Sequence, residues 1–278
     1  MFKWTGGKRK EIPRFAPYFP RFVADGSPYV YVEPFVGGGA VFWHLANPDS
    51  AINDWDGELV NFYEQVAAQD EQFLAEVSSV AELFAPGADR DAQAEAYYRL
   101  RDLDRGGRLG EHPGWLRAAR FFVVTQLAFS GMRRFNADGE FNVPFGHYRS
   151  FNASALRSEA HTRLLRATAI TQGDYGEVLE HHDNPRTFVF VDPPYTRIMK
   201  KYSPGATFDD DSQRELAAKL LALRYASFML VIDRSPLTEE LYRGHIATTY
   251  TLSYGVNIKN RFSQASEHLV VCNYQTPA

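Results

Sequence analysis

The stretch YVYVEPFVGGGAVF, residues 29–42, decides the fold of this chain. Its first five residues are mostly aromatic and β-branched and predict a short buried strand over residues 29–33. Pro34 and three glycines end that strand, and AVFWHLA, residues 40–46, predicts the start of a helix. SAIND, residues 50–54, predicts a second strand. A strand, a glycine turn, a helix and a strand in this order predict a doubly wound α/β sheet.

The same strand pattern returns in the second half of the chain. Apolar runs predict further strands at residues 168–171, 187–191, 228–232, 248–254 and 267–274. A helix is predicted over residues 212–224, and the three aspartates before it suit a helix N-terminus electrostatically. We therefore expect residues 1–56 and 148–278 to form one α/β domain.

Residues 57–147 show a different pattern. Apolar residues recur at helical spacing from Gly57, with a break near Gln69, and further helices are predicted at 92–103 and 115–129. Residues 106–114 predict a loop, and an Asp-Gly pair predicts a β-hairpin over 135–148. This segment is thus expected to be a mostly helical inserted domain that ends in a hairpin.

The composition is ordinary for a soluble globular enzyme, because 45% of the 278 residues are hydrophobic and 23% are charged. We see no apolar run near the roughly 18 residues of a membrane span and no secretory leader, so we expect no membrane association. The single Cys272 excludes an internal disulfide and a multi-cysteine zinc site, and it fits a cytoplasmic setting. His161, His181 and His182 show no metal-ligand pattern, and we expect them in surface loops and expect no metal site.

Charge is distributed unevenly along the chain. The net charge of −4 does not by itself indicate a polyanionic partner. However, residues 1–21 hold six basic residues against one acid, and residues 117–149 hold five arginines against two acids. Arg197, Lys200 and Lys201 form a third basic group. If the three groups share a face, that face would suit nucleic acid; each group alone is equally consistent with solvated surface charge.

The glycine loop lacks the features of a phosphate site. Neither GxGxxG nor GxxxxGK[ST] occurs in residues 33–42. Glu33 precedes the loop, and its carboxylate would repel phosphate but suits a ligand with an ammonium or hydroxyl group. Asp54, at the end of the next strand, is placed like the acid that binds a ribose diol. Together they predict a nucleoside ligand without a pyrophosphate, although the glycines alone are explained by a turn.

A second chemical signal is FVFVDPPY, residues 188–195, at the carboxyl end of a predicted strand. Open α/β sheets bind ligands at that edge. Pro193 and Pro194 fix the backbone and supply carbonyls without an N–H. An exocyclic amine placed there could donate one hydrogen to the Asp192 carboxylate and one to the Pro193 carbonyl, with Tyr195 stacked on its ring. The pattern predicts an aromatic amine prepared for nucleophilic attack; a rigid strand exit is the structural alternative.

These motifs resemble those of the Dam-type DNA adenine-N6 methyltransferases, the alpha group of the D12 class. The matching stretches are KWTGGK (3–8), VEPFVGGGAVF (32–42), INDWD (52–56), SGMRRFNADGEFNVPFG (130–146), GDY (173–175), FVDPPY (190–195) and EHLVVCNY (267–274). The resemblance implies a Rossmann-like α/β sheet that binds S-adenosylmethionine (AdoMet), with residues 57–147 as an inserted target-recognition domain. It also implies methyl transfer to the N6 amine of a flipped-out adenine in duplex DNA.

The resemblance implies roles for individual residues. The matching cofactor-binding positions are Trp4, Gly6, Gly7, Lys8, Glu33, Pro34, Phe35, Gly37, Gly39, Asp54, Trp55, Asp174, Tyr175 and Asp192. The catalytic tetrapeptide matches Asp192, Pro193, Pro194 and Tyr195. DNA contacts are expected from Lys3, Phe129, Ser130, Met132, Arg133, Arg134, Asn136, Asn142, Pro144, Arg197 and Lys200. Lys3 and Arg134 match the guanine-contacting positions of members that recognise GATC, and Lys8 is a further candidate for a phosphate contact.

Several positions have simpler explanations or depart from the family pattern. Trp4 could be a core residue, Lys3 and Lys8 surface charges, and Asp174 a helix cap. Ser130 stands where close family members more often have Asn, and Met132 and Arg133 also differ, so the recognised site could differ from GATC.

The expected partner is double-stranded DNA, for a monomer or weak dimer. The enzyme could act alone, serve a phage, or protect DNA from a restriction nuclease encoded separately. Two other functions stay open: methylation of another amine, in RNA or on a protein glutamine, and DNA binding without catalysis.

Overall fold

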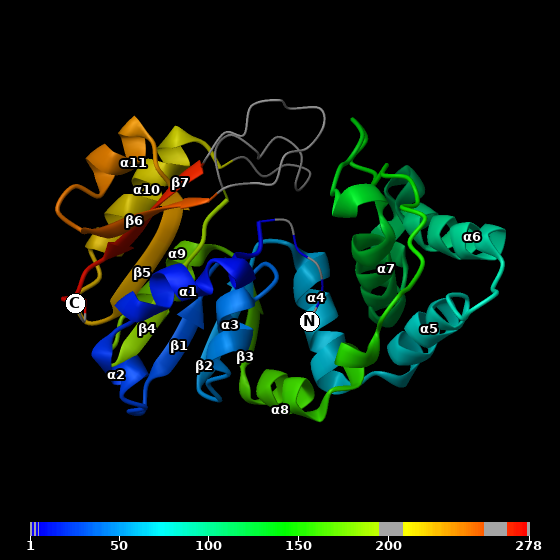
Figure 1. Ribbon diagram of the computed structural model, residues 1–278, viewed down its shortest axis with the longest axis horizontal. Coiled ribbons are helices and arrows are strands. Elements are labelled where there is room, and N and C mark those ends of the chain that lie inside the picture. Colours follow the sequence, from blue (N-terminus) through cyan, green and yellow to red (C-terminus); the bar gives the residue numbers. More distant parts are fainter. Residues whose placement is uncertain (1, 3, 5, 195–207, 253–265, 277–278) are drawn as a thin grey trace.

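The structure is a computed structural model, and it describes residues 2, 4, 6–194, 208–252 and 266–276. Within these residues, seven strands form one sheet in the order β3-β2-β1-β4-β5-β7-β6 (Figure 1). The strands are β1 (Val30–Glu33), β2 (Ser50–Asp54), β3 (Ala169–Gln172), β4 (Thr187–Val191), β5 (Ser227–Asp233), β6 (Ile246–Leu252) and β7 (Ser266–Cys272). The predicted α/β sheet is confirmed, and every predicted strand ends within two residues of the observed one.

The sheet is parallel from β3 to β5, and only β7 runs antiparallel to its neighbours β5 and β6. The chain order reverses next to β1, which pairs with β2 on one side and β4 on the other. Because parallel strands point the same way, the carboxyl ends of β1, β2, β4 and β5 meet at one edge of the sheet. That edge, at a change of strand order, is where open α/β sheets bind ligands.

Alternating side chains of the strands pack helices on both faces of the sheet. On β4, Phe188 and Phe190 face a core shared with α1 (Ile12–Phe15), α3 (Ala40–Leu45) and α8 (Glu159–Ala167). Val189 and Val191 face a second core shared with α9 (Tyr175–His181) and α10 (Asp210–Leu221). The strand is therefore apolar on both faces, as expected for a central parallel strand.

Four longer helices follow β2: α4 (Gly57–Ala68), α5 (Glu71–Glu82), α6 (Arg90–Arg101) and α7 (Gly114–Leu127). α4 ends at Gln69, whose left-handed backbone (φ 56°) accounts for the predicted break. α5, α6 and α7 lie beside the sheet in Figure 1, with α4 between them and the strands. The division into two domains at residues 57 and 147 stays a prediction.

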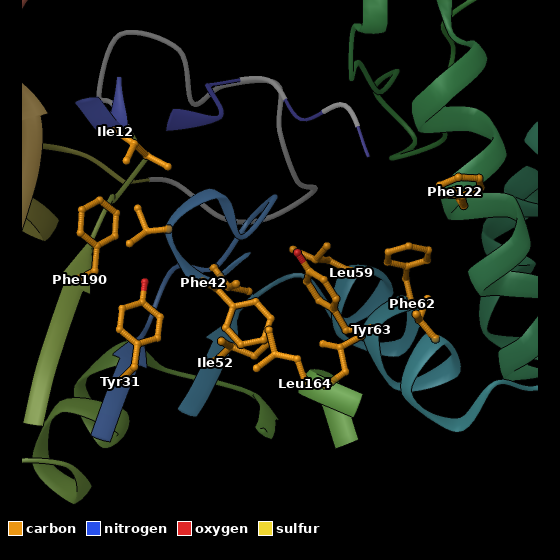
Figure 2. Close-up of a cluster of buried hydrophobic side chains, with 14 of the residues drawn as sticks. Ile12, Tyr31, Phe42, Ile52, Leu59, Phe62, Tyr63, Phe122, Leu164 and Phe190 are labelled. Atoms are coloured by element: carbon orange, nitrogen blue, oxygen red, sulfur yellow. The ribbon is translucent and has the colours of Figure 1, made fainter. Parts of the chain in front are cut away.

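One apolar core continues from the sheet into these helices. α4 contacts β2, β3 and α8 as well as α7. Figure 2 follows this core from Phe190 and Tyr31 on the strands to Phe62 on α4 and Phe122 on α7. The rings of Phe62 and Phe122 stack with centroids 5.7 Å apart. The helical segment and the sheet thus share buried surface through α4.

Four expectations about local structure were wrong in detail. The loop predicted at 106–114 is largely 3-10 helix, Asp102–Glu111, with non-helical backbone at Arg105, Gly106 and Gly107. The long apolar helix ends at Leu127, because the Leu127 carbonyl accepts a hydrogen bond from Gly146 N instead of continuing the helix. α10 begins at Asp210, since the Asp209 side chain caps its N-terminus. His161 and His181 belong to α8 and α9 rather than to loops.

The predicted hairpin is present in reduced form. Phe135 and Phe141 form a single antiparallel bridge around a turn in which Asn136 N donates to Glu140 O. Ala128 forms a second antiparallel bridge with Phe145. No continuous strand occurs among residues 128–148. Alternating burial of Phe141, Val143 and Phe145 nevertheless packs one side of this segment, called here the hairpin (residues 134–146), against α6 and α7.

Candidate active site

Glu33 ends β1 as a buried carboxyl group at the ligand-binding edge of the sheet. Tyr31 Oη donates to Glu33 Oε2 over 2.7 Å, and Phe42 N, in the first turns of α3, donates to the same oxygen over 3.1 Å. Burial, aided by the nearby carboxylates of Asp192 and Asp54, raises the pKa of Glu33 to about 8 against the lowering effect of the hydrogen bonds from Tyr31 and Phe42. Without a bound cation, Glu33 is therefore mostly protonated near neutral pH.

Asp54 ends β2 and ties the glycine loop to that strand. Its Oδ2 accepts a hydrogen bond from Gly37 N at 2.9 Å, and its Oδ1 accepts one from Asp56 N at 3.0 Å. Burial raises the pKa of Asp54 to about 6, although these two hydrogen bonds oppose the shift. A cationic ligand between Glu33 and Asp54 would return both groups to their charged forms.

Trp4 lies directly against the glycine loop. A Cβ atom on Gly37 would lie 2.6 Å from Trp4 Nε1, and one on Gly38 would lie 2.7 Å from Trp4 Cβ. Glycine is needed at Gly37 for a second reason, since its φ is 46°. Trp4 also packs edge-on against Phe2, with ring centroids 5.7 Å apart. The N-terminal segment therefore closes over the loop, and Trp4 is half-buried there.

Asp192 follows β4 and forms an ion pair with Lys8. Lys8 Nζ lies 2.8 Å from Asp192 Oδ1, and the Lys8 side chain is only 2% exposed. Burial raises the pKa of Asp192, while Lys8 opposes that shift. The alternative in which Lys8 is a surface charge is wrong, because the side chain is directed into the site. Pro193 is buried after Asp192, and the Pro194 carbonyl accepts a hydrogen bond from Gln213 Nε2 at 3.5 Å.

Sequence reasoning missed a buried ionic cluster beside this pair. His268 on β7 is 1% exposed, with Nδ1 3.1 Å from Glu11 Oε2 and Nε2 3.0 Å from Asp233 Oδ1. Burial lowers the pKa of His268, but Asp233 and Glu11 outweigh that effect and hold the pKa above its ordinary value. Tyr250 Oη donates to Glu11 Oε2 over 2.7 Å. A histidine inside the apolar run of β7 was the only signal in the sequence.

Three aromatic residues lie just after the carboxyl ends of strands: Phe35 after β1, Trp55 after β2 and Tyr175 after β3. Phe35 and Tyr175 have ring centroids 5.0 Å apart. Asp174 caps α9 by accepting a hydrogen bond from Gly176 N at 2.7 Å, so the helix-cap explanation of this residue is confirmed. Trp55, directly after β2, exposes 63% of its surface. Pro34 is buried, and its carbonyl accepts a hydrogen bond from Asn53.

The described residues among those predicted to contact DNA lie just after α7 and on the hairpin. Phe129 and Met132 are exposed apolar side chains on either side of Ser130, whose backbone is left-handed (φ 55°). Arg134 is exposed and donates from Nε to Asn142 Oδ1 over 2.8 Å. Pro144 is also exposed. Asn136 instead donates to Glu140 and holds the turn of the hairpin together.

Arg133 points the opposite way from Arg134. Its Nη2 atom lies 2.7 Å from Asp56 Oδ2, and its side chain is 10% exposed. Its guanidinium also lies 4.8 Å from the centroid of the Trp4 ring. A base contact by Arg133 would therefore require both interactions to break.

Four predicted site residues lie outside the described residues: Lys3, Tyr195, Arg197 and Lys200. Gly6 and Gly7 are exposed in the N-terminal segment, and Gly7 N donates to Trp4 O. Within the described part of the chain, no group of three or more His, Cys, Asp or Glu side chains could hold a metal ion. No helix there is long and apolar enough to cross a membrane.

Nearly the whole sequence is similar to that of known DNA methyltransferases. The model of the D12 class N6 adenine-specific DNA methyltransferases matches residues 4–258. The chain is 30% identical to the type II methyltransferase M.CviBI of Paramecium bursaria Chlorella virus NC1A, with 99% of each chain covered. It is 31% identical to the type II methyltransferase M1.LlaDCHI of Lactococcus lactis subsp. cremoris, over 87% of this chain and 83% of that one. It is 26% identical to the DNA adenine methylase of Escherichia coli K12, over 87% and 84%.

Proposed function

Because the chain belongs to the D12 class N6 adenine-specific DNA methyltransferases, we propose that it transfers a methyl group from AdoMet to the N6 amine of an adenine in duplex DNA. The observation that carries this proposal is the Lys8–Asp192 ion pair at the carboxyl end of β4, beside the carboxyl groups that end β1 and β2. The carboxylates of this site suit a cationic methyl donor, and the rigid Asp192-Pro193-Pro194 backbone suits an aromatic amine.

The carboxyl groups of the site fit the chemistry of AdoMet. The cofactor carries an ammonium and a sulfonium. Burial raises the pKa of Glu33, Asp54 and Asp192, and the carboxylates of Asp192 and Asp54 add to the shift at Glu33, so a bound cation would favour the ionised forms of these groups. The glycine loop adds a backbone surface that a nucleoside can approach closely. The exposed ring of Trp55 lies one residue after Asp54, where it would pack on the adenine of the cofactor.

Asp192 is assigned the role of holding the target amine. Its carboxylate accepts one N6 hydrogen and the Pro193 carbonyl accepts the other, which directs the nitrogen lone pair out of conjugation with the ring. Lys8 favours the ionised form of Asp192, which is the form that can accept. When bound, AdoMet would supply a methyl group from its sulfonium: the S–CH₃ bond would break as the N–CH₃ bond forms, with the electron pair left on sulfur as a neutral thioether. The proton that the nitrogen then loses would pass to Asp192 or to water.

The target adenine must leave the base stack, because a pocket cannot enclose N6 inside the duplex. We assign the groove contacts to the hairpin and the preceding turn. Arg134 and Pro144 are exposed there, and Phe129, Ser130 and Met132 form the adjoining exposed segment. An arginine in the major groove pairs bidentately with guanine. GATC is the proposed site, with Lys3 and Arg134 as guanine contacts and Arg197 and Lys200 as phosphate contacts.

The names of two relatives, both type II methyltransferases, favour a biological role in protecting DNA. We assign this chain the same role, with a restriction nuclease encoded separately as its partner. The protein acts on DNA as a monomer or weak dimer in this proposal.

Methylation mapping tests the proposed function directly. The gene would be expressed in a host without adenine methylation, and host DNA would be sequenced with a method that detects N6-methyladenine. We expect modification of adenines in one short motif, and none with the Asp192→Ala variant. Methylation of RNA or protein from the same host, without any DNA methylation, would favour another amine as the substrate and overturn the proposal. Wild-type modification retained in Asp192→Ala would overturn the role of that carboxylate.

A further inference from the structure

Arg133 and Arg134 are adjacent in sequence but belong to different surroundings. Arg134 is exposed on the hairpin, where it contacts only Asn142 among the described residues. Arg133 crosses to the sheet side, forms the ion pair with Asp56 and lies over the rings of Trp4 and Phe121, 4.8 and 5.3 Å from their centroids. A guanidinium desolvated between two rings and a carboxylate is held in one position.

A continuous chain of contacts leads from Arg133 to the glycine loop. Asp56 uses Oδ2 for Arg133 and Oδ1 to cap α4, where Glu58 N and Leu59 N donate to it. Asp56 N donates to Asp54, whose other oxygen accepts from Gly37 N. Each of these bonds fixes the orientation of the next group, so movement of Arg133 would change the support of the loop.

A second route passes through the Trp4 ring. Arg133 lies over one part of this ring, and the indole touches the loop so closely that Gly37 and Gly38 have no room for a Cβ atom. Trp4 therefore lies between Arg133 and the loop. Both routes end at Gly37, so two sets of contacts connect Arg133 to the glycine loop.

We propose that Arg133 is a positioning residue that couples duplex binding at segment 129–134 to cofactor binding at the glycine loop. This inference rests on the proposed function, because it takes DNA as the ligand of one segment and AdoMet as the ligand of the other. Coupling of this kind is reciprocal: a cofactor that orders the loop tightens duplex binding by the same factor by which the duplex tightens cofactor binding. Couplings of about 5- to 150-fold are typical of proteins.

The chain offers a matched control for this contact. Arg117 on α7 also forms an ion pair with a residue in the first turn of α4, since its Nε atom lies 3.0 Å from Glu58 Oε1. Among the described residues, the Arg117 side chain hydrogen-bonds to Glu58 and not to Trp4, Asp56 or the glycine loop. Arg117→Met therefore removes another arginine–carboxylate ion pair at the start of α4 without removing either route to the loop.

Binding measurements without turnover test the inference. The dissociation constant of a fluorescent duplex carrying the mapped methylation motif would be measured with and without S-adenosylhomocysteine, which has no methyl group to transfer. In wild type and in Arg117→Met we expect S-adenosylhomocysteine to tighten duplex binding at least fivefold. In Arg133→Met we expect the ratio to fall to within about twofold of one, a loss within the range of typical couplings.

A second variant keeps the test decisive if Arg133→Met does not fold. Asp56→Asn retains a good N-cap for α4 and removes only the charge that faces Arg133. In this variant too, the ratio of the duplex dissociation constants without and with S-adenosylhomocysteine should be lower than in wild type. A wild-type ratio retained in either folded variant overturns the inference. A ratio of one in wild type, with both ligands bound, also overturns it while the proposed function stands. Absence of S-adenosylhomocysteine binding to wild type overturns the proposed function itself and the coupling with it.

Discussion

Replacing Lys8 with Met isolates what the buried lysine does for Asp192. The two charges lie 2.8 Å apart, and at an effective dielectric constant near 20 their attraction is about 6 kcal/mol. Methionine is buried at less cost than an ammonium, so part of that attraction is offset. Removal of one partner of a buried pair typically costs about 3–5 kcal/mol. We expect the free energy of unfolding to fall by about 3 kcal/mol above neutral pH.

The sign of the pH dependence follows from the pKa of Asp192, which is already raised by burial and which the substitution raises further. A carboxyl group whose folded pKa lies above its unfolded value stabilises the fold at low pH, and that stability is lost as pH rises through the folded pKa. The deficit of Lys8→Met relative to wild type should therefore be small in acid and largest in alkali. Methyl transfer needs ionised Asp192, so the residual activity of the variant should instead increase with pH.

The pH dependence of stability is checked by urea unfolding over a pH series. The pH dependence of activity is checked by methyl transfer to plasmid DNA over the same series. Lys10→Met is the matched control, because Lys10 belongs to the same 3-10 helix, Lys8–Lys10, but is exposed. That control should follow wild type in both measurements. A stability deficit of equal size at every pH, or a pH profile of activity that overlaps the wild-type profile, would refute the assigned role of Lys8.

Three further predictions concern the ligands of the site. AdoMet should bind more tightly as pH rises from 6 to above 8, because burial raises the pKa of Glu33 to about 8 and a cation favours its ionised form. Calorimetry should show that the affinity for S-adenosylhomocysteine, which lacks the sulfonium, depends less on pH. Equal pH dependence of the two affinities would contradict this prediction. Asp54→Ala should weaken AdoMet binding by about 1.5–3 kcal/mol while leaving duplex binding in the absence of cofactor near wild type; an unchanged AdoMet titration would exclude Asp54 as a ligand. Arg134→Ala should reduce discrimination at one base pair by about 1–3 kcal/mol, measured on duplexes with each position of the motif substituted in turn; an equal loss on every duplex would mean that Arg134 contacts the backbone and no base.

The sheet could be predicted from the sequence because local patterns determine it. Apolar strands of four to seven residues alternate with helical periodicity, and glycine or proline separates them. The carboxylates at the ends of β1 and β2 followed from the same pattern, since parallel strands bring their carboxyl ends together. Errors at helix ends arose where a distant group competes for the last carbonyls, as Gly146 does at Leu127.

The partners of charged side chains could not be predicted in this way. Lys8 and Asp192 are far apart in sequence, and nothing local indicates that one neutralises the other. Arg133 and Arg134 have similar neighbours in sequence, yet one is nearly buried and the other exposed. The cluster around His268 joins Glu11, in the turn before α1, to residues of three strands. Such contacts depend on which elements pack together, which is decided by the whole fold.

Along the hairpin, buried residues that pack on the helices alternate with outward residues that form the surface. Phe141, Val143 and Phe145 pack on α6 and α7, whereas Asn142 and Pro144 lie on the other side with Arg134. Mutations at the outward positions would change the surface that we propose contacts DNA, without disturbing the apolar packing beneath. New recognition sequences could therefore arise one outward residue at a time without loss of foldability. A randomised library for altered specificity should vary residues 134, 142 and 144 and keep the inward residues fixed.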